Sequence, residues 1–231
     1  MVRLDKYISN STDLSRTEVK RMVRAGIVEV DNEIVTNPAE KIATASEVVI
    51  DGAVILASGE RYFMLNKPIG VVSATKDKQH PTALSLIHEH RSEELQIAGR
   101  LDIDTTGLLL ITSDGQWNHR VTSPRADCRK VYAVTLANPI EDDYPNKLAR
   151  GIYLKGEKHR CMPAAMEKIG SHELTLSIRE GKYHQVKRMF AALGNQVVAL
   201  HRFKVGNIEL DDRLLEGDYR PLSEQEVNSI A

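Results

Sequence analysis

The sequence predicts an α+β protein in two parts, a small module over residues 1–57 and a larger region over residues 58–231. Two observations support this class. Apolar residues recur at helical spacing in some segments, most clearly between Val186 and Leu193, where one buried stripe is expected. Other segments are short apolar runs of strand length, bounded by polar residues and glycine. Helical and strand patterns are therefore both present.

The composition is that of a globular protein and excludes several other classes. The chain has 231 residues, 42 % of them hydrophobic, and a formal net charge of −1. Overall charge therefore does not indicate nucleic-acid binding, and any basic surface must be local. Cys128 and Cys161 form no CxxC pair, so we expect two reduced thiols rather than a disulfide framework or a zinc site. The charged N-terminus and the lack of a long apolar run predict a cytoplasmic protein without signal peptide or membrane span.

The N-terminal module is predicted to begin with two helices. Apolar residues four apart favour a short helix over residues 3–10. A second helix starts at a capping box, in which Ser15 accepts from a free helical N–H and Glu18 reaches back. It is expected to run to about Ala25, and Gly26 provides the stop. Its buried stripe consists of Val19, Met22 and Val23.

Basic residues are concentrated on this second helix. Residues 1–58 contain seven Lys or Arg and nine Asp or Glu, yet four of the seven basic residues lie on it. They are Arg16, Lys20, Arg21 and Arg24. One interpretation is a solvated helix face, and the other is a phosphate-contacting patch on a small RNA-binding domain. After the helix, an alternating segment with an Asp31-Asn32 turn and a strand over residues 48–54 complete the module.

The larger region follows a linker predicted over residues 57–60 and contains both element types. Strands are predicted over residues 61–65, 96–101, 108–112, 131–136, 173–179 and 197–204. Helices are predicted over residues 116–121, 141–150, 184–193 and 223–230. Asp114 is the expected N-cap of the first of these helices, and Trp117 is expected to pack it. Gly194 is the expected stop of the third.

The run over residues 99–115 presents charged groups between two apolar strands. Arg100 and Asp102 are delivered to a turn rather than a core, an arrangement that suits chemistry on an anionic, planar substrate. Asp104 allows a second interpretation, because two carboxylates two residues apart could form the acid/base pair of a glycosidase. The favoured interpretation is that Asp104 bonds Thr106 or local backbone N–H groups and shapes the turn.

Four strings of the larger region carry a family resemblance. They are Leu65-Asn66-Lys67-Pro68-Ile69-Gly70, Gly99-Arg100-Leu101-Asp102 with Thr105-Thr106-Gly107, Lys130-Val131-Tyr132, and the run from Glu180 to Met189. Together they resemble the motifs of the pseudouridine synthases, and more narrowly of the branch that modifies bacterial ribosomal RNA. That branch carries an N-terminal alpha-L RNA-binding motif, which the order of elements in residues 1–57 resembles. Asn32 stands where that motif often has Gly, a mild departure because Asn tolerates positive φ.

The resemblance implies an alpha-L RNA-binding domain at residues 1–57 and a pseudouridine synthase domain at residues 58–231 with a mixed, mainly antiparallel sheet. It implies isomerisation of a specific uridine in ribosomal RNA, by a monomer acting on RNA alone or on an assembling small-subunit particle. The reaction needs no metal, cofactor or energy donor. The sequence agrees, since it has no phosphate-cradling Gly loop, dinucleotide fingerprint or metal-spaced His/Cys cluster.

Three functions are compatible with these strings. The strings are most similar to those of enzymes acting on small-subunit (16S) RNA, although large-subunit enzymes share every one of them. A non-catalytic RNA-binding protein of ribosome assembly is the third alternative. Intact Asp102, Tyr132 and Lys187 argue against it, because a protein that only binds RNA does not need that set.

The resemblance also implies roles for single residues. Asp102 is the ionised carboxylate, acting as nucleophile or as partner to a cationic sugar, and Lys187 is its basic partner. Tyr132 stacks on the target base and helps remove the carbon-bound proton, and Arg100 fills the gap left by the flipped nucleotide. RNA contacts are expected at Arg16, Lys20, Arg21, Arg24, Lys67 and Arg188.

Lys67 has an alternative role, and three histidines are assigned none. For Lys67 the alternative is that the Lys-Pro-x-Gly string mainly sets a turn against the active site. His80, His184 and His201 are assigned no catalytic role, because the sequence places no carboxylate or nucleophile to orient them.

Overall fold

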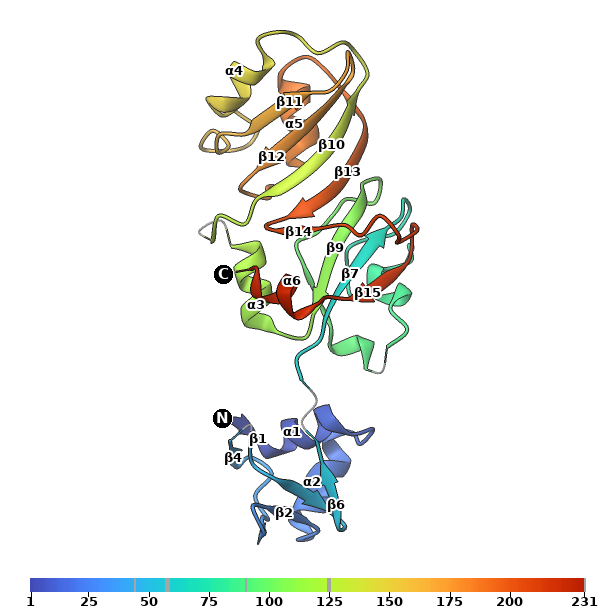
Figure 1. Cartoon of the computed structure of the whole chain (residues 1–231), viewed down its shortest axis with the longest axis vertical. Coiled ribbons are helices and arrows are strands. Elements are labelled where there is room, and N and C mark those ends of the chain that lie inside the picture. Colours follow the sequence, from blue (N-terminus) through green and yellow to red (C-terminus); the bar gives the residue numbers. More distant parts are fainter. Residues whose placement is uncertain (44, 57–58, 90, 124–125, 231) are drawn as a thin grey trace. The chain divides into compact units, whose positions relative to one another are not determined.

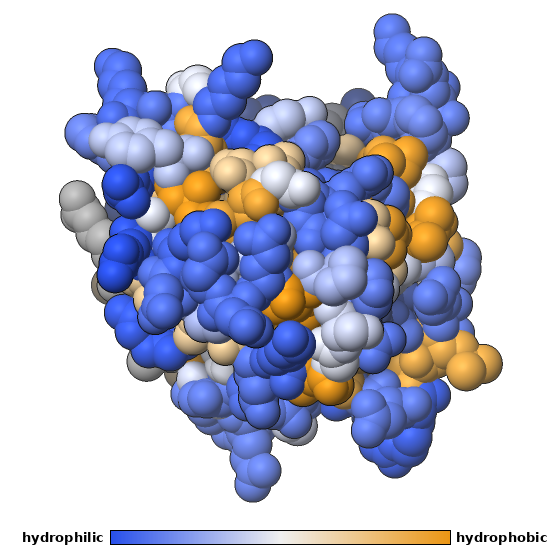
Figure 2. Space-filling view, turned by 90° about the horizontal axis from the view of Figure 1, so that it is seen from above, coloured by the Kyte–Doolittle hydropathy of each residue, from blue (hydrophilic) through white to orange (hydrophobic). Residues whose placement is uncertain are grey.

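The computed structural model describes residues 1–43, 45–56, 59–89, 91–123 and 126–230. Residue contacts divide the chain into two compact units, Met1–Glu60 and Arg61–Ala231, and each has its own hydrophobic core. Residues 57 and 58 of the predicted linker lie outside the described residues. In the described part of the chain, no helix is long and apolar enough to cross a membrane. Figure 2 shows a face on which hydrophilic side chains predominate over small hydrophobic groups.

The first unit contains the two expected helices, α1 (Leu4–Ser11) and α2 (Arg16–Arg24). The capping box of α2 is confirmed, because Glu18 N donates to Ser15 Oγ at 3.3 Å and Ser15 N donates to Glu18 Oε2 at 2.8 Å. The predicted stripe is buried at Val19 and Val23, which pack with α1 in one core. This packing leaves the charged side of α2 at the surface.

Two small sheets complete this unit. A four-stranded sheet has the order β3 (Glu33–Ile34), β2 (Val28–Val30), β5 (Val48–Ile50), β6 (Ala53–Ile55), and β1 (Val2–Arg3) pairs with β4 (Lys41–Ile42). The predicted turn is confirmed, since Asp31 and Asn32 both have positive φ. The single strand expected over residues 48–54 is wrong, because Asp51 and Gly52 take positive φ and fold it into a hairpin.

A nine-stranded sheet organises the second unit (Figure 1). Its main path is β11 (Ala165–Lys168), β12 (Glu173–Ile178), β10 (Lys130–Leu136), β13 (Val197–Val205), β9 (Thr106–Thr112), β7 (Tyr62–Lys67), β15 (Tyr219–Pro221). Off this path, β14 (Ile208–Glu209) pairs β13 and β8 (Gln96–Ala98) pairs β9. Only the β9–β13 pair is parallel among these described strands, so the expected mixed, mainly antiparallel sheet is confirmed.

Both faces of the sheet centre are covered. Successive residues of a strand point to opposite faces, and on β9 Leu108 and Leu110 join one core cluster while Leu109 and Ile111 join another. This explains why the apolar run of β9 is continuous rather than alternating. One face packs against α3 (Gly115–Thr122) through the fully buried Trp117. The other is continuous with the cluster that contains α5 (Gln185–Ala192).

The helices agree with their predicted positions and differ at the ends. Asp114 caps α3 as expected, accepting from the backbone N–H groups of Gln116 and Trp117. The helix expected over residues 141–150 is shorter, because α4 (Tyr144–Ala149) begins with Pro145 in its first turn. Two 3₁₀ turns, η1 (Ala83–Leu86) and η2 (Ser92–Glu94), were not predicted.

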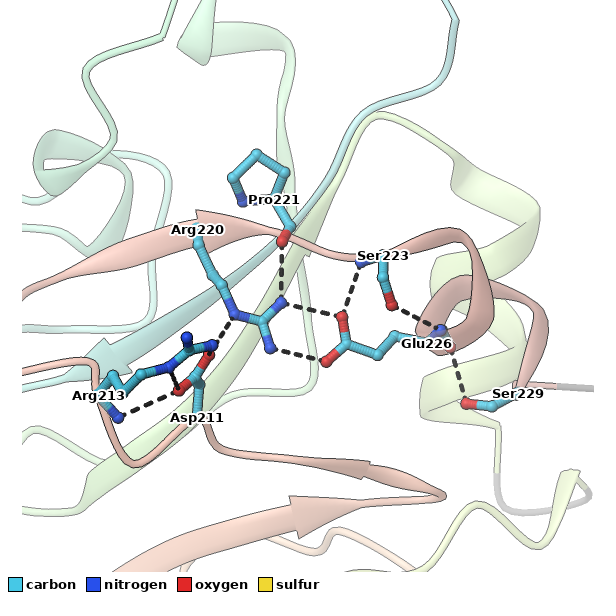
Figure 3. A network of polar contacts seen from close by, with 7 residues as sticks. All are labelled: Asp211, Arg213, Arg220, Pro221, Ser223, Glu226 and Ser229. Carbon is cyan, nitrogen blue, oxygen red and sulfur yellow. Dashed lines mark hydrogen bonds and ion pairs between the residues drawn. The ribbon is translucent and has the colours of Figure 1, made fainter.

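A charged network ties the C-terminal segment together (Figure 3). Arg220 of β15 donates to both carboxylate oxygens of Glu226, at 2.9 and 2.8 Å, and to Asp211 at 2.9 Å. Glu226 lies in α6 (Glu224–Asn228) and closes the capping box of Ser223. The bidentate pair with Arg220 lowers the pKa of Glu226 to about 2. The network therefore joins the last strand to the last helix.

Candidate active site

A pocket of about 580 Å³ lies at the turn between β8 and β9. Arg100 and Asp102 of this turn line it together with Tyr132 of β10 and His184, which directly precedes α5. The structure therefore brings three of the predicted site residues, which come from two separate strings, to one cavity. The fourth predicted residue, Lys187, does not line the pocket but contacts Asp102.

Hydrogen bonds from the backbone and from one serine side chain fix the turn that carries Asp102. Ser73 Oγ donates to Leu101 O at 2.8 Å and accepts from Leu101 N at 3.0 Å. Asp102 O accepts from Thr105 N at 3.1 Å, and Gly70 N donates to Ile103 O at 2.9 Å. The carboxylate is thus held on a turn that neighbouring segments brace on both sides, as a preorganised site requires.

Arg202 is a supporting residue that the sequence analysis missed. Its side chain is only 2 % exposed and comes from β13. The guanidinium donates to Leu108 O at 2.8 Å and to Gly99 O at 3.1 Å, so it ties the turn to the sheet. A Cβ at Gly107 would lie 2.3 Å from Arg202 O, which is why the parallel strands need glycine there. Arg202 lies two residues after the buried Leu200, so strand alternation places it on the core face of β13, and this is the sequence signal that could have found it.

Lys187 stands between two carboxylates. Its Nζ donates to Asp102 Oδ2 at 3.0 Å and also to Asp104 Oδ1. Burial alone would lower the pKa of Lys187, but the hydrogen bonds and charges of Asp104 and Asp102 raise it. Burial would likewise raise the pKa of Asp104, and the bond to Lys187 lowers it below the ordinary value. Lys187 is therefore held as an ammonium and Asp104 as a carboxylate at neutral pH.

One predicted partner of Asp104, Thr106, is corrected by this geometry. Its carboxylate bonds Lys187 rather than Thr106, whose hydroxyl lies 2.8 Å from His201 Nδ1. The reason is that α5 approaches the turn and offers an ammonium, which a carboxylate prefers to a neutral hydroxyl.

The sequence places no carboxylate next to His184, but the fold does. Its Nε2 lies 3.5 Å from Asp102 Oδ1. The contact joins residues far apart in sequence, and it depends on a left-handed backbone at His184, with φ 45° and ψ 39°. His80 also has a carboxylate partner, since its Nδ1 lies 3.3 Å from Asp77 Oδ1, but both residues are exposed. Of the two histidines, His184 is the one that belongs to the pocket.

Tyr132 and Lys130 share one face of β10 and both line the pocket. Tyr132 is buried within the strand, with its ring in the core cluster. Lys130 is buried too, and its Nζ donates to Val121 O at 2.9 Å and to Cys128 O at 2.6 Å. Burial lowers the pKa of Lys130. The Lys-x-Tyr string therefore places an aromatic ring at the cavity and anchors the strand beneath it.

Lys67 does not lie where an RNA contact could form. Its side chain is fully buried, and Nζ donates to Pro68 O and Val71 O, both at 2.8 Å. Burial lowers its pKa to about 8. These bonds close the turn whose Gly70 N binds Ile103 O, so the structure favours the alternative in which this string sets a turn against the site. The expected RNA contact at Lys67 is corrected accordingly.

The other expected RNA contacts differ in their surroundings. Arg188 donates to Glu157 Oε1 at 3.2 Å, to Tyr183 O at 2.9 Å and to Lys155 O at 2.7 Å, so it fastens neighbouring loops to α5. The basic residues of α2 are exposed or half-buried. These are Arg16, Lys20, Arg21 and Arg24. In the part of the chain that the structure describes, no group of three or more His, Cys, Asp or Glu side chains is arranged to hold a metal ion.

Comparisons with known proteins give a consistent result. The sequence pattern of the RNA pseudouridylate synthase family matches residues 61–192, and that of the S4 domain matches residues 2–52. A protein of Escherichia coli (strain K12) named ribosomal small subunit pseudouridine synthase A is 50 % identical over 99 % of this chain and 100 % of its own. A protein of the same name from Vibrio cholerae is 49 % identical over 99 % of both chains. A crystal structure of a pseudouridylate synthase, 44 % identical, covers both chains completely with a TM-score of 0.73.

Proposed function

Since this chain belongs to the RNA pseudouridylate synthase family, we propose that it isomerises one uridine of small-subunit ribosomal RNA to pseudouridine. The relatives named for the small ribosomal subunit support this substrate, because their similarity extends through both units of the chain. The observation that carries the proposal is the contact of Asp102 with Lys187 beside a pocket that Tyr132 lines. The reaction requires an ionised carboxylate, and we assign that role to Asp102.

The chemistry assigns distinct tasks to these groups. Isomerisation breaks the bond from base nitrogen to sugar carbon, turns the base, forms a carbon–carbon bond and releases the proton of the new attachment carbon. We assign the carboxylate of this reaction to Asp102, as nucleophile or as partner to a cationic sugar. Lys187 places an ammonium 3.0 Å from that carboxylate in a partly buried site, where it attracts the negative charge. No electron or phosphoryl group is transferred in these steps.

Tyr132 and Arg100 are assigned to the base and to the gap that it leaves. The ring of Tyr132 is buried at the pocket, which supports stacking against the target base and assistance in removing the carbon-bound proton. Arg100 is exposed at the mouth of the same pocket. A side chain that fills the space vacated by a flipped nucleotide offsets part of the cost of extrusion, a few kcal/mol.

The S4 domain is assigned to holding the RNA. The exposed basic residues of α2 suit phosphate contacts, which position an RNA without reading its sequence. We propose action as a monomer, because Asp102, Lys187 and Tyr132 come together within one unit of the chain. The substrate implies action in the cytoplasm, on RNA alone or on an assembling small-subunit particle.

Mapping pseudouridines in ribosomal RNA tests this proposal. Cells that lack the protein are expected to lose one site in small-subunit RNA. Wild-type protein restores this site and the Asp102→Asn variant does not. A lost site in large-subunit RNA would overturn the proposed substrate. An unchanged map would overturn the function and favour the non-catalytic alternative.

A further inference from the structure

Two aromatic side chains are stacked beside the catalytic carboxylate. The rings of Tyr183 and His184 have centroids 3.8 Å apart and planes inclined by 20°. Both residues line the pocket of Asp102, and His184 Nε2 lies 3.5 Å from Asp102 Oδ1. Tyr183 is 70 % exposed. The stack therefore begins at the carboxylate and ends on a tyrosine that is open to solvent.

Hydrogen bonds hold the segment that carries this stack. Tyr183 O accepts from Arg188 Nη1 at 2.9 Å. Lys182 N donates to Gln185 Oε1 at 2.9 Å, and Gln185 Nε2 donates to Glu180 Oε1 at 3.0 Å. Glu180 is itself held by Met162 N at 2.7 Å. The rings are thus presented by a fixed backbone, so ordering them on binding costs little entropy.

The backbone of His184 gives a second indication of purpose. A non-glycine residue in the left-handed region is uncommon, and His184 holds it at the N-cap of α5 without a side-chain capping bond. The imidazole instead stacks on Tyr183 and faces Asp102. A residue that gives up a cap to hold such a geometry points to a role at the site.

An exposed aromatic face next to a nucleotide-flipping site is suited to bind an unpaired nucleobase. Flipping removes the target uridine from its stack and leaves the neighbouring bases with one face uncovered. Proteins that bind unpaired RNA supply aromatic rings to such bases, and the contact tolerates any base because every base has a π-face.

We propose that the stacked pair of Tyr183 and His184 is a second nucleobase subsite, which takes the unpaired base directly next to the target uridine. This inference rests on the proposed function and extends it from one base to two. The bound base lies on Tyr183, and His184 supports the ring from the side of Asp102. The subsite recognises an unpaired neighbour rather than a particular base.

The subsite can be tested with a double-mutant cycle, in which one change is made in the protein and one in the RNA. The full-length chain acts on a small-subunit RNA fragment labelled at carbon 5 of uridine, and tritium release gives kcat/KM. In two further RNAs, the nucleotide on the 5′ or the 3′ side of the target is abasic. Tyr183→Ala is expected to lower kcat/KM on intact RNA by about 5- to 150-fold, the range for loss of one stacked base.

The abasic RNAs show whether that loss of kcat/KM comes from a missing contact with the neighbouring base. One abasic RNA is expected to lower wild-type kcat/KM by a similar factor and to leave Tyr183→Ala unchanged, so the two changes are not additive. Tyr183→Phe keeps the stacking face and is expected to restore most of the kcat/KM that Tyr183→Ala loses. The matched control is Tyr153→Ala, since Tyr153 is also an exposed tyrosine but does not line the pocket.

The failures of the two proposals are distinguishable. Wild-type activity on intact RNA with no response to either abasic RNA overturns the subsite and leaves the proposed function intact. Additive losses from Tyr183→Ala and the abasic RNA also overturn it, because the ring and the base then do not meet. Absence of tritium release with wild-type protein on intact RNA overturns the proposed function itself.

Discussion

Replacing Lys187 by methionine is expected to slow the reaction by removing the cation that Asp102 and Asp104 share. The Nζ of Lys187 lies 3.0 Å from Asp102 Oδ2. Two unit charges at that separation attract by about 5–6 kcal/mol at an effective dielectric constant of about 20, an upper bound. The two side chains are 24 % and 26 % exposed, so desolvation and solvent screening reduce the net value. A charge-assisted hydrogen bond then contributes about 1.5–3 kcal/mol, which corresponds to a rate loss of about 10- to 150-fold.

Single-turnover tritium release from carbon-5-labelled ribosomal RNA, at saturating enzyme, measures this loss without a contribution from product release. Lys187→Arg keeps the charge and is expected to lie between the methionine variant and wild type. Lys204→Met is the matched control, because it breaks a surface ion pair with Glu209 away from the pocket. A Lys187→Met enzyme that reacts at the wild-type rate would refute the reasoning.

Three further predictions concern stability and RNA binding. Glu226→Gln is expected to lower the free energy of unfolding by about 1–3 kcal/mol at pH 7. The guanidinium bonded to Glu226 holds its pKa at about 2 against an ordinary 4.5, so this contribution is complete above pH 4.5. It is lost as the pH falls towards 2, and denaturant unfolding at pH 7, 5 and 3 checks whether the difference narrows. Burial holds the pKa of Lys67 at about 8 against 10.5, so between these values the unfolded chain binds more protons than the folded one. Wild-type stability relative to Lys67→Met therefore rises from pH 8 to pH 10, by at most about 1.4 kcal/mol per pH unit, and a constant difference contradicts the burial argument. Replacing Arg16, Lys20 and Arg24 together by alanine is expected to reduce the slope of log affinity for RNA against log salt by about 2–3. An unchanged slope would remove α2 from the interface.

Local chemistry accounts for the parts of the fold that were predictable. The capping box of Ser15 and Glu18 and the Asp31-Asn32 turn depend on residues next to one another, so the sequence contains the whole interaction. The hairpin at Asp51 does not follow from the apolar pattern although its turn is also local, because the apolar residues on both sides resemble one continuous strand. The strands β1, β4, β11, β14 and β15 were not predicted, because two to four residues carry too little pattern. Partners distant in the chain decide their pairing.

The site was predictable as far as family strings reach. These strings predict that Asp102 and Lys187 form a pair. The structure brings the two residues together although 85 positions separate them. The approach of Asp104 and His184 to the same centre was not predictable, because it depends on how α5 meets the turn. Lys67 shows the opposite error, since the family string suggested an RNA contact while the burial of this side chain depends on the fold.

Asp102→Asn and Asp104→Asn, compared in the tritium-release assay, test the central claim most directly. Both carboxylates contact Lys187, and the two substitutions change each side chain in the same way. With a single catalytic carboxylate, Asp102→Asn releases no tritium above background while it still binds the RNA. Asp104→Asn keeps measurable release, lowered by the change at Lys187. Release by Asp102→Asn at a rate near wild type would contradict the account, as would an equal and complete loss in both variants.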